Sequence, residues 1–297
     1  MKRKALFIIN PVSGGKKKDE VPELIQKYVD PSAFETDVEF TSGVLHARSL
    51  AKAAADEYDI IVAVGGDGTI NEIASAIAGT DTVLGIIPYG SGNGLSRFLN
   101  IPMNVEGAFK TFNAGRTITI DAAKMNDQWF FNMAGMGFDA HISHVFAQGS
   151  KTRGFYNYLK SSIQEIASYK AQTYQLLIDG KPYEREAFML SFANSSQYGN
   201  NAHISPEASV QDGLLDVCII KPFPLYRFPE MGLRMITKTA NKTSYVEIIQ
   251  GKHIEVSRKA DGAIHLDGEP QVAGTNLKID IVPATLKVIV GVSYKNK

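Results

Sequence analysis

The sequence predicts two domains, a parallel-sheet α/β domain followed by an antiparallel β-sandwich. Three observations lead to this fold class. Short apolar runs alternate with helical segments over the first 120 residues, glycine-rich turns follow two of those runs, and most segments after Thr117 have the character of strands. The length of 297 residues agrees with about two domains of ordinary size.

In the first domain, strands and helices are expected to alternate. β-branched and aliphatic runs predict strands at residues 5–9, 37–41, 60–64 and 83–87. An alanine-rich stretch predicts one helix, and apolar residues that repeat on one face predict another; they span residues 46–57 and 69–78. This order is typical of a parallel sheet covered by helices, and we place the end of the domain at residue 120.

From about Thr117 onward strands dominate, and we place the second domain at residues 121–285. They are expected at residues 117–125, 129–133, 174–178, 188–192, 214–220, 245–249, 254–257, 263–266, 277–282 and 286–290. Helical insertions are expected at residues 154–169 and 225–237. Tight turns between the strands indicate an antiparallel β-sandwich.

Composition narrows the class of protein. Lysine and arginine number 31, as do aspartate and glutamate, so the chain lacks the overall positive charge typical of nucleic-acid binding. No apolar stretch approaches the roughly 18 residues of a membrane span, so any membrane contact is expected to be peripheral. The single cysteine, Cys218, lies in an apolar run and is expected to be buried and inert.

Two glycine-rich turns are the strongest local signals. Gly65-Gly66-Asp67-Gly68-Thr69 leaves an expected strand and enters a helix, where backbone N–H groups suit phosphate. A carboxylate beside phosphates needs a cation, so Asp67 suggests Mg²⁺. The alternative is a plain strand-helix turn with Asp67 as the cap. Gly90-Ser91-Gly92-Asn93-Gly94 follows the next strand, so both turns should meet at one edge of the sheet, where α/β folds bind ligands.

Standard nucleotide-binding motifs are absent. Gly15-Lys16 is followed by Lys17, and Asn10 stands where a Walker A motif requires its first glycine. Neither glycine turn contains G-x-G-x-x-G. The sequence therefore indicates neither a P-loop enzyme nor a standard Rossmann dehydrogenase.

Motifs spread over nearly the whole chain resemble the diacylglycerol kinase catalytic domain family, which includes soluble bacterial diacylglycerol kinases and sphingosine kinases. In the first domain they are Asn10-Pro11-x-Ser13-Gly14, Thr41 with His46-Ala47 following, Gly65-Gly66-Asp67-Gly68-Thr69-x-Asn71-Glu72 and Pro88-x-Gly90-Ser91-Gly92-Asn93. In the second they are Asp212-Gly213-x-Leu215-Asp216-Val217 and Leu266-Asp267-Gly268-Glu269. The first glycine turn alone is less specific, because NAD kinases and phosphofructokinases share it.

The resemblance implies an ATP- and Mg²⁺-dependent kinase that phosphorylates a lipid hydroxyl, with a nucleotide-binding domain, a β-sandwich and a last segment, about 286–297, that packs back on the first domain. Asp67 and Glu269 would be catalytic, Glu269 as general base with Asp267 beside it. The nucleotide would be contacted by Asn10, Ser13, Thr41, Gly65, Gly66, Asp67, Gly68, Thr69, Gly90, Ser91, Gly92 and Asn93. A structural Mg²⁺ would be held by Asp212, the backbone of Leu214 or Leu215, and Asp216.

Without the resemblance, the acidic motifs of the second domain have simpler interpretations. Asp267-Gly268-Glu269 is also typical of a hairpin turn with solvated charges, and Asp212 with Asp216 of an Asp-Gly turn that enters a strand. Gly94 departs from bacterial diacylglycerol kinases, which usually carry aspartate there, whereas sphingosine kinases carry a small residue. Diacylglycerol and a sphingoid base therefore both stay candidate substrates.

Two other functions stay open: an NAD kinase-like enzyme, and a lipid-binding module without catalysis. The chain is expected in the cytoplasm, in peripheral contact with the inner face of the membrane, where it would bind its lipid substrate. A second copy of the chain stays an open alternative as a partner, and no nucleic acid is expected. The basic amphipathic segment 221–238 either lies in a membrane interface or packs on the sandwich.

Overall fold

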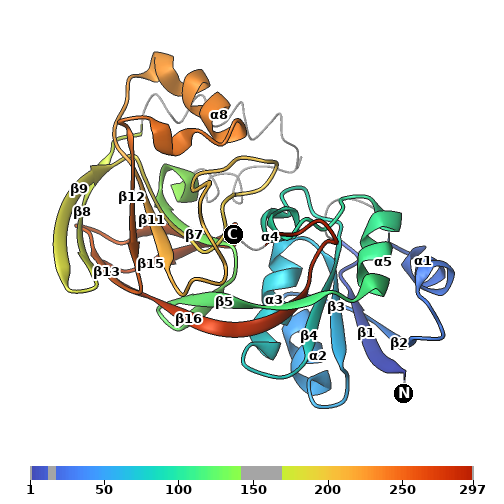
Figure 1. Cartoon of the computed structure of the whole chain (residues 1–297). Helices are drawn as coiled ribbons and strands as arrows, with labels where there is room; N and C mark the ends of the chain where they lie inside the picture. The colour runs from blue at the N-terminus through green and yellow to red at the C-terminus, as the bar shows by residue number, and fades with distance from the viewer. Residues whose placement is uncertain (1, 13–17, 142–168, 296–297) are drawn as a thin grey trace. The chain divides into compact units, whose positions relative to one another are not determined.

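The computed structural model describes residues 2–12, 18–141 and 169–295. The chain divides into two compact units (Figure 1). Unit 1 comprises Met1–Ala122 together with Val282–Lys297, and unit 2 comprises Ala123–Ile281. The chain passes from unit 1 to unit 2 in strand β5 (Thr117–Met125) and returns in strand β16 (Asn276–Ile289).

Unit 1 is built on a parallel sheet, as the sequence predicts. Its order is β2-β1-β3-β4, and the end of β16 runs parallel to β4. The strands are β1 (Arg3–Ile9), β2 (Phe34–Phe40), β3 (Ile60–Gly65) and β4 (Val83–Pro88). Every residue of β3 and β4 is buried, which explains their unbroken apolar sequence: both faces of a central parallel strand are covered.

Helices cover both faces of this sheet (Figure 1). They are α1 (Val21–Tyr28), α2 (His46–Ala54), α3 (Asp67–Ile77), the short α4 (Gly94–Phe98) and α5 (Val105–Ala114). Phe7 of β1 packs on Phe109 and Phe112 of α5, with ring centroids 6.2 and 5.3 Å apart. The sequence analysis did not assign α1 or α5. The apolar face of α1 is short and buries only Val21 and Ile25.

Unit 2 is an antiparallel β-sandwich. One sheet has the order β12-β11-β10-β7-β14-β15, and the other contains β13 between β16 and β8, with β9 beyond β8. The strands are β6 (Gln128–Phe130), β7 (Met133–Gly137), β8 (Gln172–Ile178), β9 (Lys181–Ala187), β10 (Met189–Ala193), β11 (Leu215–Ile220), β12 (Val246–Gly251), β13 (His253–Ser257), β14 (Gly262–Leu266) and β15 (Glu269–Ala273). Alternate residues of facing strands form its core, including Tyr174, Phe192, Val217 and Ile254.

Three strand predictions were wrong in detail. The expected strand 129–133 is two strands, because the N–H groups of residues 131–133 bond to the carboxylate of Asp267. The expected strands 277–282 and 286–290 are one strand, β16; its N–H at Ala284, where φ is 50°, bonds to Asp121 Oδ1 at 2.8 Å. Strands β9 and β15 were not assigned because their sequences are largely polar and only partly buried, and so lack the apolar pattern of a core strand.

The expected helix 225–237 is confirmed, as a 3₁₀ turn η2 (Leu225–Arg227) that continues into α8 (Phe228–Ile236). A short η3 (Ala240–Lys242) follows. The expected helix 154–169 lies outside the described residues apart from Tyr169. Among the helices in the described ranges, none is long and apolar enough to cross a bilayer. Cys218 is buried, as expected.

Candidate active site

The predicted nucleotide-binding residues of unit 1 gather at one edge of the parallel sheet. Asn10 follows β1, Thr41 follows β2, Gly65 ends β3 and Tyr89 follows β4. Ladder bonds hold these ends in register: Thr41 N donates to Ile9 O at 2.9 Å, Asn10 N to Val64 O at 3.1 Å and Tyr89 N to Gly65 O at 2.7 Å. The expectation that both glycine turns lie at neighbouring strand ends is confirmed by the parallel pairing of β3 with β4.

The two glycine turns touch each other. A Cβ atom on Gly90 would lie 2.6 Å from the Cα of Gly66, so the backbones approach too closely for any side chain at position 90. Asn93 sits in the left-handed region at φ 51°, and its Nδ2 donates to Gly90 O at 2.6 Å. In the described part of the chain, the buried Oδ1 of Asn93 has no hydrogen-bond partner.

Asp67 joins the two turns. Its Oδ2 accepts a hydrogen bond from Asn93 N at 2.8 Å, and its Oδ1 accepts one from Gly94 N at 2.9 Å. The carboxylate is therefore stabilised by backbone N–H groups at the start of α4, before any cation is considered. Asp67 is the first residue of α3, whose N-cap is Gly66, so it does not occupy the cap position that the sequence left as an alternative. Its carboxylate instead holds the second turn against the first.

Lys18 is a polar residue of this region that belongs to a lysine run with the sequence pattern of a solvated segment, yet it is buried. It is 1% exposed, its Nζ donates to Asn10 O at 2.7 Å, and the amine lies 5.4 Å from the ring centroid of Tyr89. Burial lowers the pKa of Lys18 to about 8. In the sequence it is the last of three consecutive lysines, and nothing in that run marks it as the buried one.

Side chains of Asn10 and Glu72 connect the strand ends to the neighbouring helices. Asn10 Nδ2 donates to Thr69 Oγ1 at 3.0 Å, which ties the end of β1 to the first turn of α3. Glu72, in the next turn of α3, accepts hydrogen bonds from Leu45 N at 3.1 Å and Arg48 N at 3.3 Å. Glu72 thereby caps α2 and positions the loop that begins at Thr41. Ser13 lies outside the described residues.

In unit 2, the Asp267-Gly268-Glu269 motif forms a two-residue hairpin between β14 and β15. Asp267 and Gly268 both have positive φ, 49° and 87°, as a type I′ turn requires. Asp267 is 8% exposed and accepts hydrogen bonds from the N–H groups of Phe131, Asn132 and Met133 at 3.0, 2.9 and 3.0 Å. The hairpin interpretation is confirmed, but its first charge is buried in backbone contacts, whereas Glu269 is exposed.

The residues expected to hold a structural Mg²⁺ are occupied by protein contacts. Asp216 is buried and accepts hydrogen bonds from Ser205 Oγ and from Gln250 Nε2, the latter at 2.9 Å. Asp212 Oδ1 accepts a bond from Leu214 N at 3.0 Å, within an Asp-Gly turn. In the described part of the chain, no three histidine, cysteine, aspartate or glutamate side chains come together as metal ligands. The metal role of these residues stays a prediction.

Sequence reasoning also missed a buried polar cluster in unit 2. His265 Nε2 lies 3.0 Å from Asp139 Oδ2, which also accepts a hydrogen bond from the hydroxyl of Tyr198 at 3.3 Å. Gly135 lies opposite His265, and a Cβ there would come within 2.5 Å of its Nε2. Burial raises the pKa of Tyr198 well above its ordinary value. The four residues are separated by up to 130 positions in the sequence, so no local pattern could have joined them.

Comparison with known proteins identifies a family for each of the two parts of the chain. The profile of the diacylglycerol kinase catalytic domain matches residues 4–125, and that of the YegS C-terminal NAD kinase beta sandwich-like domain matches residues 132–290. The chain belongs to the diacylglycerol kinase catalytic domain family. It is thus a kinase of that family and carries the YegS-type C-terminal domain.

Two curated relatives are named diacylglycerol kinase. The one from Staphylococcus aureus (strain bovine RF122 / ET3-1) is 28% identical over 91% of this chain and 87% of its own length. The one from Bacillus subtilis (strain 168) is 28% identical over 90% of each chain. A crystal structure of a candidate diacylglycerol kinase from Bacillus anthracis str. Sterne superposes with a TM-score of 0.80 at 24% identity, covering 98% of both chains. This last match concerns the fold alone.

Proposed function

We propose that this family member is an ATP-dependent lipid kinase that transfers the γ-phosphate to the hydroxyl of diacylglycerol or a related lipid such as a sphingoid base. The observation that carries the proposal is the contact between the two glycine turns, with the Asp67 carboxylate bonded at their junction. The relatives named diacylglycerol kinase support the choice of a lipid alcohol as acceptor.

The residues at the sheet edge fit the phosphates of ATP. In α3, Ile70 N donates to Gly66 O at 3.0 Å, so the N–H groups of residues 67–69 precede the helix's own ladder and suit a phosphate. The buried Oδ1 of Asn93, without a partner in the described residues, is the kind of atom that a ligand or its water satisfies. The Lys18 amine supplies positive charge beside the same strand ends.

Each proposed role follows from the chemistry of the group. Mg²⁺, when bound, would neutralise phosphate charge, and the Asp67 carboxylate at the junction of the two turns is an oxygen ligand of the kind that Mg²⁺ prefers. Glu269 would accept the proton of the lipid hydroxyl while the oxygen of that hydroxyl bonds to the γ-phosphorus and ADP leaves. Asp267 would position Glu269 through the hairpin rather than act on the substrate, because its oxygens are bonded to the backbone of residues 131–133.

A lipid-panel kinase assay tests the proposal. Purified protein with labelled ATP and Mg²⁺ is offered diacylglycerol, a sphingoid base and NAD, with Asp67→Asn as the matched variant. We expect label transfer to a lipid, at least a hundredfold lower in the variant, because loss of the Asp67 carboxylate would weaken the hold on Mg²⁺, and removal of a group that stabilises transition-state charge costs about that factor. Transfer to NAD alone would assign the chain to the NAD kinase-like alternative, and binding of lipid without turnover would make it a lipid-binding module.

Gly94 bears on the choice between the lipids. Its N–H lies 2.9 Å from Asp67 Oδ1, so a carboxylate at position 94 would stand close to the carboxylate of Asp67. Two such groups repel unless they share a cation or a proton. The glycine leaves more room and less negative charge around the reacting hydroxyl. We therefore propose that the chain phosphorylates a sphingoid base alongside any diacylglycerol.

The substitution Gly94→Asp should shift the ratio of the two activities toward diacylglycerol. The measurement is kcat/KM for both lipids in the wild type and the variant at saturating Mg²⁺-ATP, and we expect a change in the ratio of about tenfold, equivalent to roughly 1.4 kcal/mol. An unchanged ratio would show that Gly94 does not set substrate choice.

A further inference from the structure

Helix α8 and the 3₁₀ turn before it carry two apolar stripes on different faces. The inner stripe consists of Phe228, Met231 and Met235, spaced three and four residues apart. Met231 is 6% exposed and belongs to a core cluster of unit 2, Met235 packs against that cluster, and Phe228 stacks on Phe223 with ring centroids 6.4 Å apart. This stripe is the face by which the segment packs on the sandwich.

The outer stripe has the same helical spacing but faces solvent. It consists of Tyr226, Pro229, Leu233 and Ile236, all exposed. Tyr226 is 77% exposed, Leu233 60% and Ile236 61%. Leu225, 54% exposed, lies beside them in the same turn. A surface helix of a globular protein ordinarily carries polar residues on the face opposite its core stripe, and a continuous apolar stripe there marks an interaction surface.

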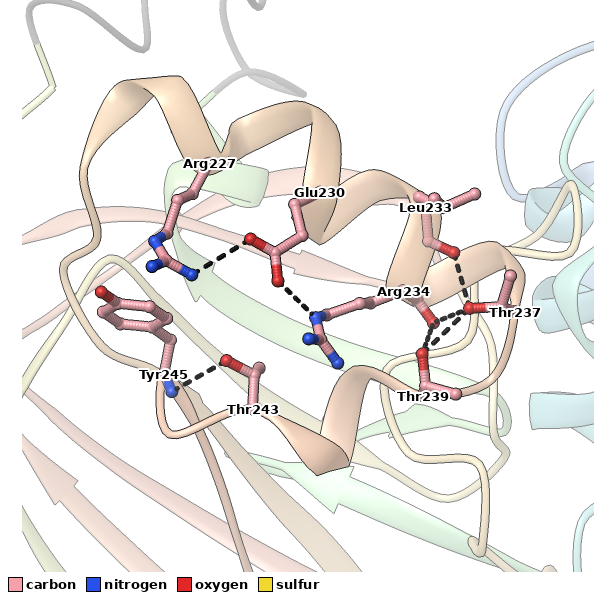
Figure 2. A network of polar contacts seen from close by, with 8 residues as sticks. All are labelled: Arg227, Glu230, Leu233, Arg234, Thr237, Thr239, Thr243 and Tyr245. Carbon is pink, nitrogen blue, oxygen red and sulfur yellow. Dashed lines mark hydrogen bonds and ion pairs between the residues drawn. The ribbon is translucent and has the colours of Figure 1, made fainter.

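A set of charged residues accompanies this stripe along the helix, and Figure 2 shows three of them, Arg227, Glu230 and Arg234, joined by ion pairs. Glu230 accepts bonds from Arg227 Nη1 at 3.1 Å and from Arg234 Nε at 2.8 Å, at spacings of three and four residues. Lys238 and Lys242 follow, both exposed, and within the described part of the chain neither makes an ion pair. Over residues 221–242, five basic residues (Lys221, Arg227, Arg234, Lys238 and Lys242) stand against one acidic residue (Glu230).

That excess of four positive charges belongs to a chain whose formal net charge is zero. The rest of the sequence therefore carries four net negative charges, and residues 221–242 are a local basic segment rather than part of a general positive field. Lys221 is partly neutralised by Glu247, at 3.1 Å, which leaves the positive charge concentrated at the C-terminal end of the segment. An apolar stripe with a basic flank matches an anionic bilayer surface, where apolar side chains enter the acyl boundary and cations stay among the headgroups.

The end of the helix is also prepared for an environment poor in water. The hydroxyl of Thr237 donates to Leu233 O at 2.9 Å (Figure 2). Thr239 N donates to Arg234 O at 2.8 Å. The last carbonyl groups of a helix otherwise need water. Because local donors satisfy these carbonyls, the end of α8 can leave bulk water with little loss of hydrogen bonding.

We propose that the outer stripe of α8, Tyr226-Pro229-Leu233-Ile236, docks the chain on an anionic lipid bilayer, with Arg227, Arg234, Lys238 and Lys242 among the headgroups. The choice of a bilayer over a protein partner rests on the proposed lipid kinase function. A second copy of the chain fits the stripe less well, because joining two such surfaces would bring two basic flanks together.

Binding to vesicles tests the docking surface without reference to catalysis. The full chain is sedimented with two kinds of vesicle. One is phosphatidylcholine alone, and the other contains about 30% phosphatidylglycerol, which gives a strong negative surface potential. We compare Leu233→Glu with Val292→Glu, which introduces the same charge at a valine 71% exposed in unit 1. Leu233→Glu should reduce binding to the anionic vesicles at least about tenfold, and Val292→Glu less than about twofold.

The basic flank is tested by Lys238→Gln combined with Lys242→Gln. Each lysine near an anionic surface contributes about a fivefold gain in affinity, so the pair should cost about 25-fold, a loss that fades at high salt. Leu233→Gln separates the loss of apolar contact from added repulsion and should weaken binding by less than Leu233→Glu. Equal binding of Leu233→Glu and Val292→Glu, or equal binding to both kinds of vesicle, would overturn the proposal.

Two readouts keep this proposal distinguishable from the proposed function. On a short-chain lipid dispersed in water, the Leu233→Glu variant should keep its kcat/KM within about twofold, while on bilayers its activity falls with its binding. A chain that binds anionic vesicles through α8 but transfers no phosphate would refute the kinase proposal alone. Light scattering tests self-association. If the wild type is a dimer, Leu233→Glu dissociates it and vesicle binding is unaffected, the stripe serves self-association and the docking proposal is refuted.

Discussion

Lys18 carries an ionisable group where water cannot solvate it. The side chain is almost fully buried against Asn10 O and the Tyr89 ring, and desolvation lowers its pKa to about 8 from the ordinary 10.5. Because the shift is downward, the charged amine destabilises the folded chain, and this penalty is fully present below pH 8. Between pH 8 and 10.5 the unfolded chain still holds the proton that the folded chain has lost, so this group makes stability rise with pH.

The variant Lys18→Met should therefore change the pH dependence of stability. The unfolding free energy of the wild type should rise between pH 7 and pH 10, whereas that of the variant should not. The difference, variant minus wild type, should therefore fall by on the order of 1 kcal/mol, a value discounted for solvent screening. Denaturant unfolding at several pH values measures this difference, with the exposed Lys52→Met as the matched control. A difference that does not vary with pH would show that Lys18 titrates as an ordinary surface lysine.

At the scale of the element, the β14–β15 hairpin separates two carboxylates that are neighbours in the sequence. Asp267 holds the backbone of residues 131–133 and Glu269 is exposed. A buried carboxylate that accepts three N–H groups stabilises the fold, because removing it leaves buried donors unsatisfied. Glu269, at the solvent-exposed start of β15, is accessible to a substrate. Stability and activity should therefore respond differently at the two positions.

Paired amide substitutions test this division. Asp267→Asn should lower the free energy of unfolding by about 1.5–3 kcal/mol and reduce activity through misplacement of the hairpin. Glu269→Gln should cost less stability than Asp267→Asn, because Glu269 is exposed, and should reduce kcat at least a hundredfold, as loss of a general base does. Thermal unfolding and steady-state kinetics of both variants supply the measurements. A stable, inactive Asp267→Asn would instead make Asp267 a direct participant in the reaction.

The elements that the sequence predicted well are those whose local pattern reflects their final burial. β3 and β4 are apolar throughout because both faces are covered, and the glycine turns that follow them are required by the contact at Gly66 and Gly90. The break between β6 and β7 could not be predicted, since it depends on Asp267, more than 130 residues away. The same holds for the burial of Lys18 and for the pair of Asp139 with His265.

The segment 221–238 shows why some interpretations stayed open. Its sequence fits both a core helix and an interfacial helix, because apolar residues occur on two sides of the helix. The structure assigns them: Phe228, Met231 and Met235 pack inward, and Leu233 and Ile236 face solvent. Hydrophobic periodicity identifies an apolar face but not which of two such faces meets the rest of the protein.

At the scale of the whole molecule, the proposed nucleotide and membrane functions belong to different units. The sheet edge with the glycine turns lies in unit 1, and α8 lies in unit 2, with its own core cluster. Backbone N–H groups that bond to phosphate exchange slowly with solvent deuterons, as do groups shielded by a bilayer. Two ligands should therefore leave two separate footprints in hydrogen-deuterium exchange.

We expect a non-hydrolysable ATP analogue with Mg²⁺ to slow exchange at least about threefold at residues 66–70 and 89–95, where bound phosphates would order the turns. AMP, which lacks the β- and γ-phosphates, is the matched control and should protect these turns less. Anionic vesicles should give their strongest protection at residues 225–238, and phosphatidylcholine vesicles little. Strands β10 and β11, buried in the sandwich, serve as the internal reference. Two outcomes would contradict the assignment of the two functions to separate units. One is protection of residues 225–238 by the ATP analogue without vesicles, and the other is protection of the glycine turns by vesicles without the ATP analogue.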